Sequence, residues 1–495
     1  MSLKLTCSNQ TPAVLCKQMP VAVPAGKKPS KLPAWVSTLP EDLRGSINAA
    51  FRTEGFEGKT GETVIVRCPD SSAILVGTGS ERAISAEGAR KIYGSLILSA
   101  AKAKIPHVAS PLVGGHDALE SAEAATVGSI LGNYQFTDFR TDRSKLPVPV
   151  ESVTLWEPDA NKRRKAAAGI ATGMILAEAT CRVRDLVNTP SNELNPHKYA
   201  LIAAKWCDET KIKLQVLGPD EIKRAGMGAV LAVGGGSTNE PRFLIATYTG
   251  RKGRAKETDF ALVGKGVTFD SGGISIKPSE NMWEMRGDMM GSAVVMSTIC
   301  AAAKLKLPLN LVALAPLVEN MPSGTAYRPG DIIRTLSGQT IEIISTDAEG
   351  RLILADALSY AQRFQPKAIL DVATLTGAIC IALGEVRCGI FTEKDDLARR
   401  LDKAAASSGE RLWRMPLDDD YDEGLASEVA DMKNSGGRYG GASIAARLLR
   451  KFTGDYPWVH IDIAGMDLAP KGRPYCPKGA TGFGARLIID FLRQK

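Results

Sequence analysis

Histidine is scarce in this sequence, with only four residues in a chain of 495. No His-Glu-x-x-His pattern occurs, so the zinc site that two histidines on one helix form in many metalloproteases is excluded. We expect each histidine to be structural, and a hydrolytic metal site would have to use carboxylates and lysine instead. The four histidines are His107, His116, His197 and His460.

Cysteine pairs and long apolar segments are also lacking. The nine cysteines are odd in number, scattered and without a Cys-x-x-Cys pair, which excludes a zinc ribbon and argues against a disulfide framework. No apolar run approaches the ~20 residues that span a bilayer, and the first residues lack the apolar core of a secretory signal. We therefore expect reduced thiols and a cytoplasmic protein with no membrane partner.

The composition that remains is typical of a globular protein. Apolar residues make up 44% of the chain and charged residues 23%, and the 48 glycines suit a loop-rich α/β fold. The formal net charge is +8, and the densest basic run lies at 162–165. We interpret this run as a solvated helix face, and nucleic-acid binding is the less favoured alternative.

The length and the order of apolar segments predict two domains joined by a helix. Short apolar strands alternate with helices in both halves of the chain, which is typical of α/β folds. The fold class we expect is α/β, with a smaller N-terminal α/β domain plus a larger C-terminal α/β catalytic domain that has a central mixed sheet flanked by helices. The predicted boundaries are 1–158 for the N-terminal domain, 159–187 for the linker helix and 188–495 for the catalytic domain.

Four local expectations follow from the same pattern. Residues 17–40, basic and rich in proline, are predicted to form a loop or a loosely packed strand link. A helix is expected over 80–103, with Ser80 as its N-cap. Short apolar runs predict strands at 229–233 and 309–316, and the second run is continuous enough to be buried on both faces of a sheet.

Two acidic residues occur close together in the segment Ser-Thr-Asp-Ala-Glu-Gly-Arg at 345–351. Asp347 and Glu349 are two apart, so in an extended segment their side chains would point the same way. Arg351 then opens a run with helical spacing. Two carboxylates beside a fixed cation at such a junction can bind a hard metal ion. A solvated turn at a helix start would use the same residues.

A second group of charged residues follows an apolar strand at 260–263. Lys265 and Asp270 lie where this strand gives way to a glycine-rich loop, and Lys277 and Asp288 come shortly after. Such a lysine has two interpretations. It is a salt-bridge partner of the carboxylates, or it is a neutral amine ligand, because burial and a nearby dication both favour loss of its proton.

Together these segments resemble the leucyl aminopeptidase family of metallopeptidases, and the resemblance runs from about Asn188 to the C-terminus. Further motifs in the same order carry it: Asn-Thr-Pro-Ser-Asn-Glu-Leu (188–194), Glu-Asn-Met-Pro-Ser-Gly (319–324), Ala-Thr-Leu-Thr-Gly-Ala (373–378) and Asp-Ile-Ala-Gly (462–465). The resemblance implies the metal ligands Lys265, Asp270, Asp288, Asp347 and Glu349, the catalytic residues Lys277 and Arg351, and the substrate-pocket residues Met285, Thr374 and Gly377.

The resemblance also implies an activity. The chain would be a dinuclear-metal aminopeptidase that releases N-terminal residues, preferably leucine or other apolar ones, from short peptides by a metal-activated water. Five ligands without histidine suit two divalent ions per subunit, zinc or manganese, with magnesium and cobalt as alternatives. Lys277 would stabilise the developing oxyanion. Arg351, which cannot act as a base, would hold a bicarbonate that relays the proton.

The family pattern assigns the ligands to two ions and the subunits to an assembly. Asp270 and Glu349 would bridge the ions, Lys265 and Asp288 would complete the tighter site, and Asp347 would complete the more exchangeable one. The resemblance further implies a homohexamer in which the catalytic domains cluster inside. The alternative is a non-catalytic structural or nucleic-acid-binding member of the same family, although such a member would be expected to lose ligands.

Three positions depart from the family pattern, and none of them removes a ligand. Ser345 stands where an asparagine is usual, and Met290 stands where a glycine is common. Asp467 stands where mammalian relatives carry an apolar side chain that walls the substrate pocket. Asp467 either borders this pocket and attracts a basic first residue, or it is solvated and Met466 supplies the apolar wall. We favour the second interpretation.

Overall fold

The chain folds into two compact units, which are described separately. The computed structural model describes residues 3–26, 32–53, 55–79, 84–114, 117–251, 253 and 257–494. The first unit is Met1–Cys181 with Pro470–Lys478, and the second is Arg182–Ala469 with Gly479–Lys495. The division falls inside one continuous helix, α5 (Ala160–Asn188). The domain boundaries predicted at 158 and 188 stay a prediction.

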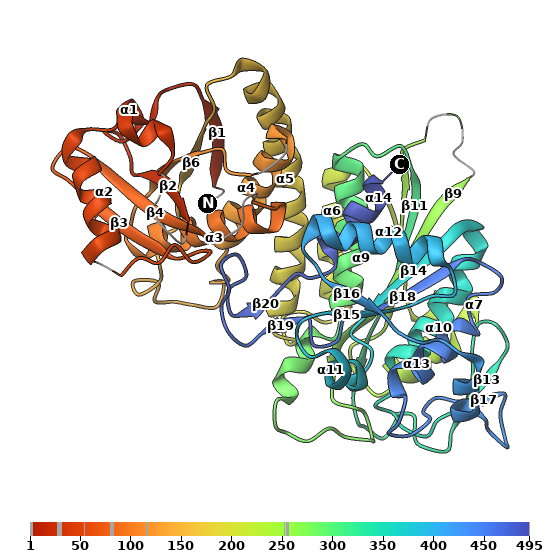
Figure 1. Ribbon diagram of the computed structural model, residues 1–495. Helices are drawn as coiled ribbons and strands as arrows, with labels where there is room; N and C mark the ends of the chain where they lie inside the picture. Colours follow the sequence, from red (N-terminus) through yellow and green to blue (C-terminus); the bar gives the residue numbers. More distant parts are fainter. Residues whose placement is uncertain are drawn as a thin grey trace. The chain divides into compact units, whose positions relative to one another are not determined.

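The first unit is built on a six-stranded sheet with helices on both faces (Figure 1). The strand order is β1-β6-β5-β2-β4-β3, in which β3 runs antiparallel to β4 and the other pairs are parallel. Its elements are β1 (Lys4–Ser8), α1 (Pro12–Leu15), β2 (Val21–Gly26), η1 (Ala34–Thr38), α2 (Glu41–Thr53), β3 (Thr63–Arg67), β4 (Ser72–Gly79), α3 (Ala86–Lys102), β5 (His107–Pro111), α4 (Ala118–Gly132) and β6 (Ser152–Trp156).

Strand β4 shows how the sequence places this sheet between two cores. Ile74 and Val76 pack into the core formed with α3 and α4, whereas Ala73 and Leu75 pack into the core formed with α2. Alternate side chains of a strand point to opposite faces. The strand therefore reads as a continuous apolar run, because both of its faces are covered.

Two expectations for the first unit are wrong. The segment 17–40, predicted as a loop or a loosely packed strand link, contains β2, which is not loosely packed but lies buried in the sheet between β5 and β4. The predicted helix over 80–103 begins later, because the side chain of Ser85 caps α3 by accepting a hydrogen bond of 3.1 Å from the Gly88 amide. Ser80, the predicted cap, lies outside the described residues.

A late segment of the chain belongs to the first unit. A Cβ atom on Gly94 of α3 would lie 2.4 Å from the carbonyl oxygen of Pro474, so only glycine allows this close approach. The hydroxyl of Tyr475 donates to the carboxylate of Glu87, with distances of 2.7 and 2.9 Å to the two oxygens. Spacing along the sequence cannot predict this contact, because no local pattern links positions so far apart.

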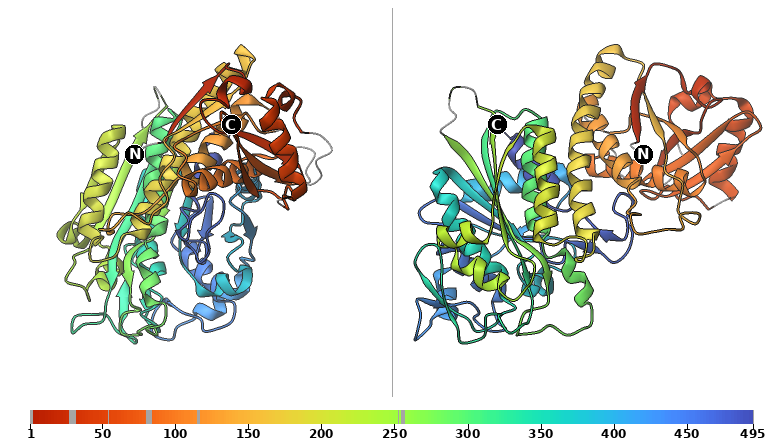
Figure 2. Two further views of the ribbon diagram at one scale, coloured as in Figure 1. Left: turned by 90° about the vertical axis from the view of Figure 1, so that its left-hand side faces the viewer. Right: turned by 180° about the vertical axis from the view of Figure 1, so that it is seen from behind.

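The second unit contains a nine-stranded mixed sheet with helices on both faces (Figures 1 and 2). The order is β16-β15-β18-β14-β9-β11-β8-β7, with β10 beside β11. Its strands are β7 (Lys213–Leu217), β8 (Arg242–Thr249), β9 (Thr258–Gly264), β10 (Gly266–Asp270), β11 (Asn310–Asn320), β14 (Pro366–Ala373), β15 (Cys388–Phe391), β16 (Leu412–Arg414) and β18 (Trp458–Asp462).

Helices α6, α9, α12 and α14 contribute to the core on one face, and α7, α8, α10, α11 and α13 to the core on the other. The helices are α6 (Pro196–Thr210), α7 (Pro219–Ala225), α8 (Gly228–Gly234), η2 (Met282–Gly287), α9 (Met290–Lys304), α10 (Gly350–Ala361), η3 (Gln362–Phe364), α11 (Gly377–Leu383), α12 (Asp395–Ser408), η4 (Asp419–Leu425), α13 (Gly441–Arg450) and α14 (Ala485–Arg493). The small sheets contain β12 (Ile332–Arg334), β13 (Thr340–Glu342), β17 (Met432–Lys433), β19 (Leu468–Ala469) and β20 (Gly479–Ala480).

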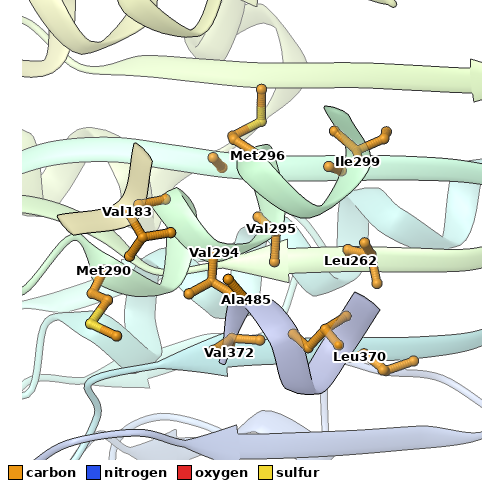
Figure 3. Close-up of a cluster of buried hydrophobic side chains, with 14 of the residues drawn as sticks. Val183, Leu262, Met290, Val294, Val295, Met296, Ile299, Leu370, Val372 and Ala485 are labelled. Carbon is orange, nitrogen blue, oxygen red and sulfur yellow. The ribbon is translucent and has the colours of Figure 1, made fainter. Parts of the chain in front are cut away.

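The predicted fold class is confirmed, and β11 illustrates why the pattern sufficed. All eleven of its residues are buried, and alternate side chains such as Leu311 and Val312 enter opposite cores. Figure 3 shows the core on the α9 side, to which Val294 and Val295 of this helix and Val372 of the sheet all contribute. The prediction of a strand at 309–316 buried on both faces is therefore confirmed.

The predicted strand at 229–233 is wrong, because this segment is helix α8. The carboxylate of Asp356, in α10, accepts a hydrogen bond of 3.0 Å from the Val230 amide and one of 2.7 Å from the Leu336 amide. An acceptor at a helix N-terminus satisfies an amide that has no partner within the helix. A short apolar run fits a strand and a buried helix equally well, and here a distant residue favours the helix.

Helix α5 corrects the expectation about apolar runs. It spans 29 residues, and its most apolar window of 18 has a mean hydropathy of 1.2, so by length and composition it could cross a membrane. Half of that window is buried within the structure. Ala166 and Ile170 pack into a core of the first unit, and Val183 into a core of the second. Core helices have the same composition, so the feature is weak evidence for a membrane.

Candidate metal centre

The predicted site residues gather where parallel strands of the second unit end. Strands β9, β10, β11 and β14 run in the same direction, so their carboxyl ends lie at one edge of the sheet. Lys265 directly follows β9, Asp270 is the last residue of β10, and Thr374 directly follows β14. This edge is where open α/β sheets bind ligands.

Lys265 is the buried centre of one half of the site. Its Nζ lies 2.8 Å from Asp288 Oδ2 and 2.8 Å from Glu349 Oε1, and it donates a hydrogen bond of 2.9 Å to the carbonyl oxygen of Thr374. A Cβ atom on Gly350 would lie 2.7 Å from this Nζ. Glycine at the first position of α10 therefore makes room for the lysine side chain.

Lys277 occupies the other half of the site. Its Nζ lies 2.9 Å from Asp270 Oδ2 and also contacts Asp347 Oδ1. The second oxygen of Asp270 accepts hydrogen bonds from the Gly272 amide, at 2.9 Å, and from the side chain of Asn320, at 2.8 Å. Each lysine of the site thus lies against two carboxylates.

The geometry and the donor set fit a divalent cation. Oxygen atoms of Asp270, Asp347 and Glu349 lie within 4.8 Å of one another. Glu349 Oε2 is buried and has no hydrogen-bond partner within the described residues. A buried carboxylate oxygen without a partner costs free energy that a cation would offset. Carboxylates with one amine suit zinc, manganese or magnesium.

The reason for expecting Asp347 and Glu349 together is corrected by the structure. They do not alternate along a strand; residues 345–349 form a turn before α10. At its centre, the carbonyl oxygen of Thr346 accepts a hydrogen bond of 2.9 Å from Asn320 and one of 2.6 Å from the Tyr327 hydroxyl. Neither Asn320 nor Tyr327 was predicted as a site residue from the sequence, although Asn320 lies within the motif at 319–324.

Burial and neighbouring charges both shift the pKa values of the buried groups of the site. Burial lowers the pKa of the Lys265 ammonium, but the Asp288 and Glu349 carboxylates outweigh it and raise the pKa above its ordinary value. The pKa of Asp288 is raised well above its usual range, chiefly by burial. Burial also raises the pKa of Asp270, and the Glu349 carboxylate adds to this effect. The carboxylates thus repel one another at close range.

Lys277 and Arg351 differ in their charged surroundings. Burial lowers the pKa of Lys277, but the nearby carboxylates, Asp270 first, raise it above its ordinary value overall. Burial lowers the pKa of Arg351, which remains a cation in proteins. Its Nη1 donates a hydrogen bond of 2.8 Å to the carbonyl oxygen of Asn434, whereas its buried Nε has no partner within the described residues.

The three predicted pocket residues are placed differently. Thr374 is buried, and its hydroxyl donates a hydrogen bond of 2.7 Å to Asp288 Oδ1, so it contacts a predicted ligand. Met285 is half-buried in η2, and Gly377 is exposed at the start of α11 with open space where a Cβ would stand. Asp467 is half-buried, and its Oδ2 would lie 3.1 Å from a Cβ on Gly287.

Comparison with known proteins identifies the family to which this chain belongs. The model of the cytosol aminopeptidase family, catalytic domain, matches residues 181–489, and the N-terminal domain model of the same family matches residues 21–143. The chain belongs to the cytosol aminopeptidase family. It is thus a metallo-exopeptidase, and the predicted aminopeptidase activity is confirmed at this level.

Relatives in this family match nearly the whole chain. The probable cytosol aminopeptidase of Syntrophotalea carbinolica is 44% identical over 472 residues, which cover 92% of each chain. That of Roseiflexus castenholzii is 43% identical over 464 residues, covering 92% of this chain and 94% of the relative.

Solved structures of the family have the same fold. A mutant of tomato leucine aminopeptidase has a TM-score of 0.88 at 32% identity and covers 99% of this chain and 97% of its own. The bottromycin maturation enzyme BotP in complex with Mn has a TM-score of 0.84 at 34% identity, covering 96% of this chain and 98% of its own. Members of the cytosol aminopeptidase family are metal-dependent, as the sequence predicts for this chain.

Proposed function

We propose that this aminopeptidase holds two divalent metal ions per subunit and removes leucine and other apolar residues from the N-termini of short peptides. The observation that carries the proposal is the convergence of Asp270, Asp347 and Glu349 beside two lysines. Shared carboxylates can hold two ions about 3.5–4 Å apart. Two ions would let the site bind both the free amine and the carbonyl of a substrate, as an exopeptidase requires.

The ligand assignment rests on the family resemblance and on the contacts of each group. Asp270 and Glu349 would bridge the ions, Asp288 and Lys265, as a neutral amine that has lost its proton to the bound metal's influence, would complete one position, and Asp347 would complete the other. When bound, such ions polarise a carbonyl and lower the pKa of water toward neutrality. We propose zinc or manganese, with magnesium and cobalt as alternatives, and the Mn complex of BotP supports manganese.

Lys277 and Arg351 are the proposed catalytic residues. Lys277 reaches the same carboxylates as the metal position, so its ammonium can donate to an oxyanion that develops there. Arg351 orients rather than takes a proton, because guanidinium stays protonated. Its unpartnered Nε supports the proposal that it binds a bicarbonate, since guanidinium pairs readily with planar oxyanions.

Metal removal tests the proposed function directly. After exhaustive chelation, confirmed by elemental analysis, the protein should no longer hydrolyse leucine amide or leucine p-nitroanilide, because no group of the chain replaces the ions. Added manganese or zinc should restore turnover. Full activity in the metal-free protein would contradict the proposed centre.

Substrate preference provides a second test, at Asp467. Met285, Thr374 and Gly377 would line a pocket that is mostly apolar, so leucine and methionine should be accepted. Burial raises the pKa of Asp467 to about 6, and above that pH its half-buried carboxylate should attract a basic first residue and repel an acidic one.

Because Asp467 is half-buried, we depart from the solvated interpretation favoured from the sequence and expect Asp467→Ala and the size-matched Asp467→Asn to lower the ratio of kcat/KM for arginine to kcat/KM for leucine substrates. The assays would compare leucine, methionine, arginine and aspartate at a pH above the pKa of Asp467. If both variants leave this ratio unchanged, Asp467 does not influence substrate preference. This is the result expected if the Asp467 side chain is solvated and lies away from the pocket.

The assembly and the location are proposed from the family alone. We propose a homohexamer, and light scattering at micromolar concentration should give the mass of six chains; the mass of one chain would overturn this. We propose a cytoplasmic location because the relatives are named cytosol aminopeptidases.

The contacts of the basic run at 162–165 give no support to a nucleic-acid-binding role. Arg163 donates to the carbonyl oxygens of Glu157 and Pro158, and Lys165 pairs with Asp117 at 3.3 Å. Side chains held by neighbouring groups would have to leave them to reach phosphates. We therefore propose aminopeptidase activity and no second function.

A further inference from the structure

One buried asparagine, outside every motif described so far, holds the turn that carries Asp347 and Glu349. Asn434 directly follows β17, which pairs in parallel with β13. Strand β13 leads into the turn at 344–349, here called the acidic turn. The Asn434 amide donates to the carbonyl oxygen of Glu342, at 2.9 Å, and its side chain is fully buried. The pairing of β17 with β13 thus places Asn434 beside the acidic turn.

The side chain of Asn434 hydrogen-bonds the backbone of the acidic turn at three residues. Its Oδ1 accepts from the amides of Ile344, at 2.8 Å, and Ser345, at 3.3 Å. Its Nδ2 donates to the carbonyl oxygens of Ser345, at 2.7 Å, and Ala348, at 3.5 Å. These positions lie on both sides of Asp347 and directly before Glu349, so the contacts fix the segment that carries both carboxylates.

The same residue also holds a proposed catalytic group. The backbone carbonyl of Asn434 accepts the 2.8 Å hydrogen bond from Arg351 Nη1. Arg351 lies two residues beyond Glu349, at the second position of α10. A shift of Asn434 would therefore move the acidic turn and the guanidinium together.

The chemistry of the contacts requires an amide at this position. Two backbone amides face one end of the side chain and two carbonyl oxygens face the other, so the side chain must accept at one end and donate at the other. Aspartate has the same size but would place an acceptor against two carbonyl oxygens. Alanine would leave the amides of Ile344 and Ser345 and the carbonyl oxygens of Ser345 and Ala348 without this partner.

We propose that Asn434 is a positioning residue, which preorganises the acidic turn for metal binding and Arg351 for catalysis. The inference rests on the proposed metal centre. Residues that orient metal ligands typically change metal affinity or activity by about 10–100-fold when replaced. Asn434 would act through backbone groups of the turn and not by touching metal or substrate.

The first test needs no variant. In the full-length, chelator-stripped wild type, hydrogen exchange should show the amides of Ile344 and Ser345 protected, because both donate to the buried side chain. Exchange at the rate of exposed amides would overturn the proposal. Asn434→Asp and Asn434→Ala should then speed up exchange in the acidic turn.

The second test measures metal affinity with a matched control. Mn²⁺ titrated calorimetrically into the stripped protein should bind about 10–100-fold more weakly in both Asn434 variants, and kcat at saturating Mn²⁺ should fall by a similar factor. Asn310→Ala is the control, because buried Asn310 also bonds backbone on both sides, accepting from the Arg251 amide at 3.0 Å and donating to the Glu257 carbonyl at 2.7 Å. It should lose thermal stability but keep Mn²⁺ affinity.

The outcomes separate this inference from the proposed function. If both Asn434 variants lose stability as Asn310→Ala does and keep Mn²⁺ affinity and kcat, Asn434 is only structural and the inference fails. If Asp347→Ala also keeps full Mn²⁺ affinity, the proposed metal centre itself fails. If neither Asn434 variant folds, the exchange of Ile344 and Ser345 in the wild type decides.

Discussion

Replacing Asp270 with alanine is expected to abolish both metal binding and peptide hydrolysis. Asp270 ends β10 at the centre of the site, and its oxygens are held by Lys277, Asn320 and the Gly272 amide. As a proposed bridging ligand it would serve both ions, so its loss would remove a ligand from each of them. Glu349→Ala should have the same effect for the same reason.

The measurement is metal content by elemental analysis after purification, together with turnover of a leucine substrate. Asp259→Ala is a matched control at the opposite end of β9. Asp259 is also buried and also pairs with two cations, Arg251 and Lys367, each at 2.9 Å. The control should lose stability but keep its metal. Wild-type metal content in both Asp270→Ala and Glu349→Ala would refute the ligand assignment.

Replacing Lys277 with alanine is expected to leave the ions in place and to lower kcat by ~10²–10³, the usual cost of removing a donor to an oxyanion. Lys277 contacts Asp270 and Asp347 through salt bridges. Without it, Asp270 still has its hydrogen bonds from the Asn320 side chain and the Gly272 amide, so we expect this carboxylate to keep its position for metal. KM should change much less than kcat, because the interaction forms mainly in the transition state.

Steady-state kinetics and elemental analysis would be run on the same preparation. Lys367→Ala removes another lysine that pairs with a buried aspartate, Asp259, outside the site, and it should leave kcat unchanged. Metal content that falls as far in Lys277→Ala as in Asp270→Ala would contradict the division between ligands and catalytic residues.

The regular parts of the fold could be predicted because their signal is local. The apolar run at 309–316 is part of β11, and the strands that end at Gly264 and Ala373 match the apolar runs before the loops. Segments that depend on distant partners were missed. Residues 229–233 are helical with a cap from Asp356, more than a hundred positions away in sequence. Strand β2 is short, and its place in the sheet depends on neighbours on both sides.

The candidate site shows the same limit. Lys265, Asp270, Asp288, Asp347 and Glu349 were chosen by motif, and the structure brings them together, whereas their roles stay predictions. The reason given for pairing Asp347 with Glu349 was wrong, since a turn and not a strand joins them. Asn434 carried no signal in the sequence. Its importance comes from the pairing of β17 with β13, and a single sequence does not reveal which strands pair.

The late segment Pro470–Lys478 affects how the chain is completed during synthesis. Most of the first unit precedes residue 182, yet the unit also includes a segment that is made only after residues 182–469 of the second unit. Until then Glu87 lacks Tyr475, and the surface of α3 around Gly94 is uncovered. Domains generally fold as they are made, starting from the N-terminus. Here the unit that begins folding first can reach its final structure only after residues 182–469 of the other unit have been made.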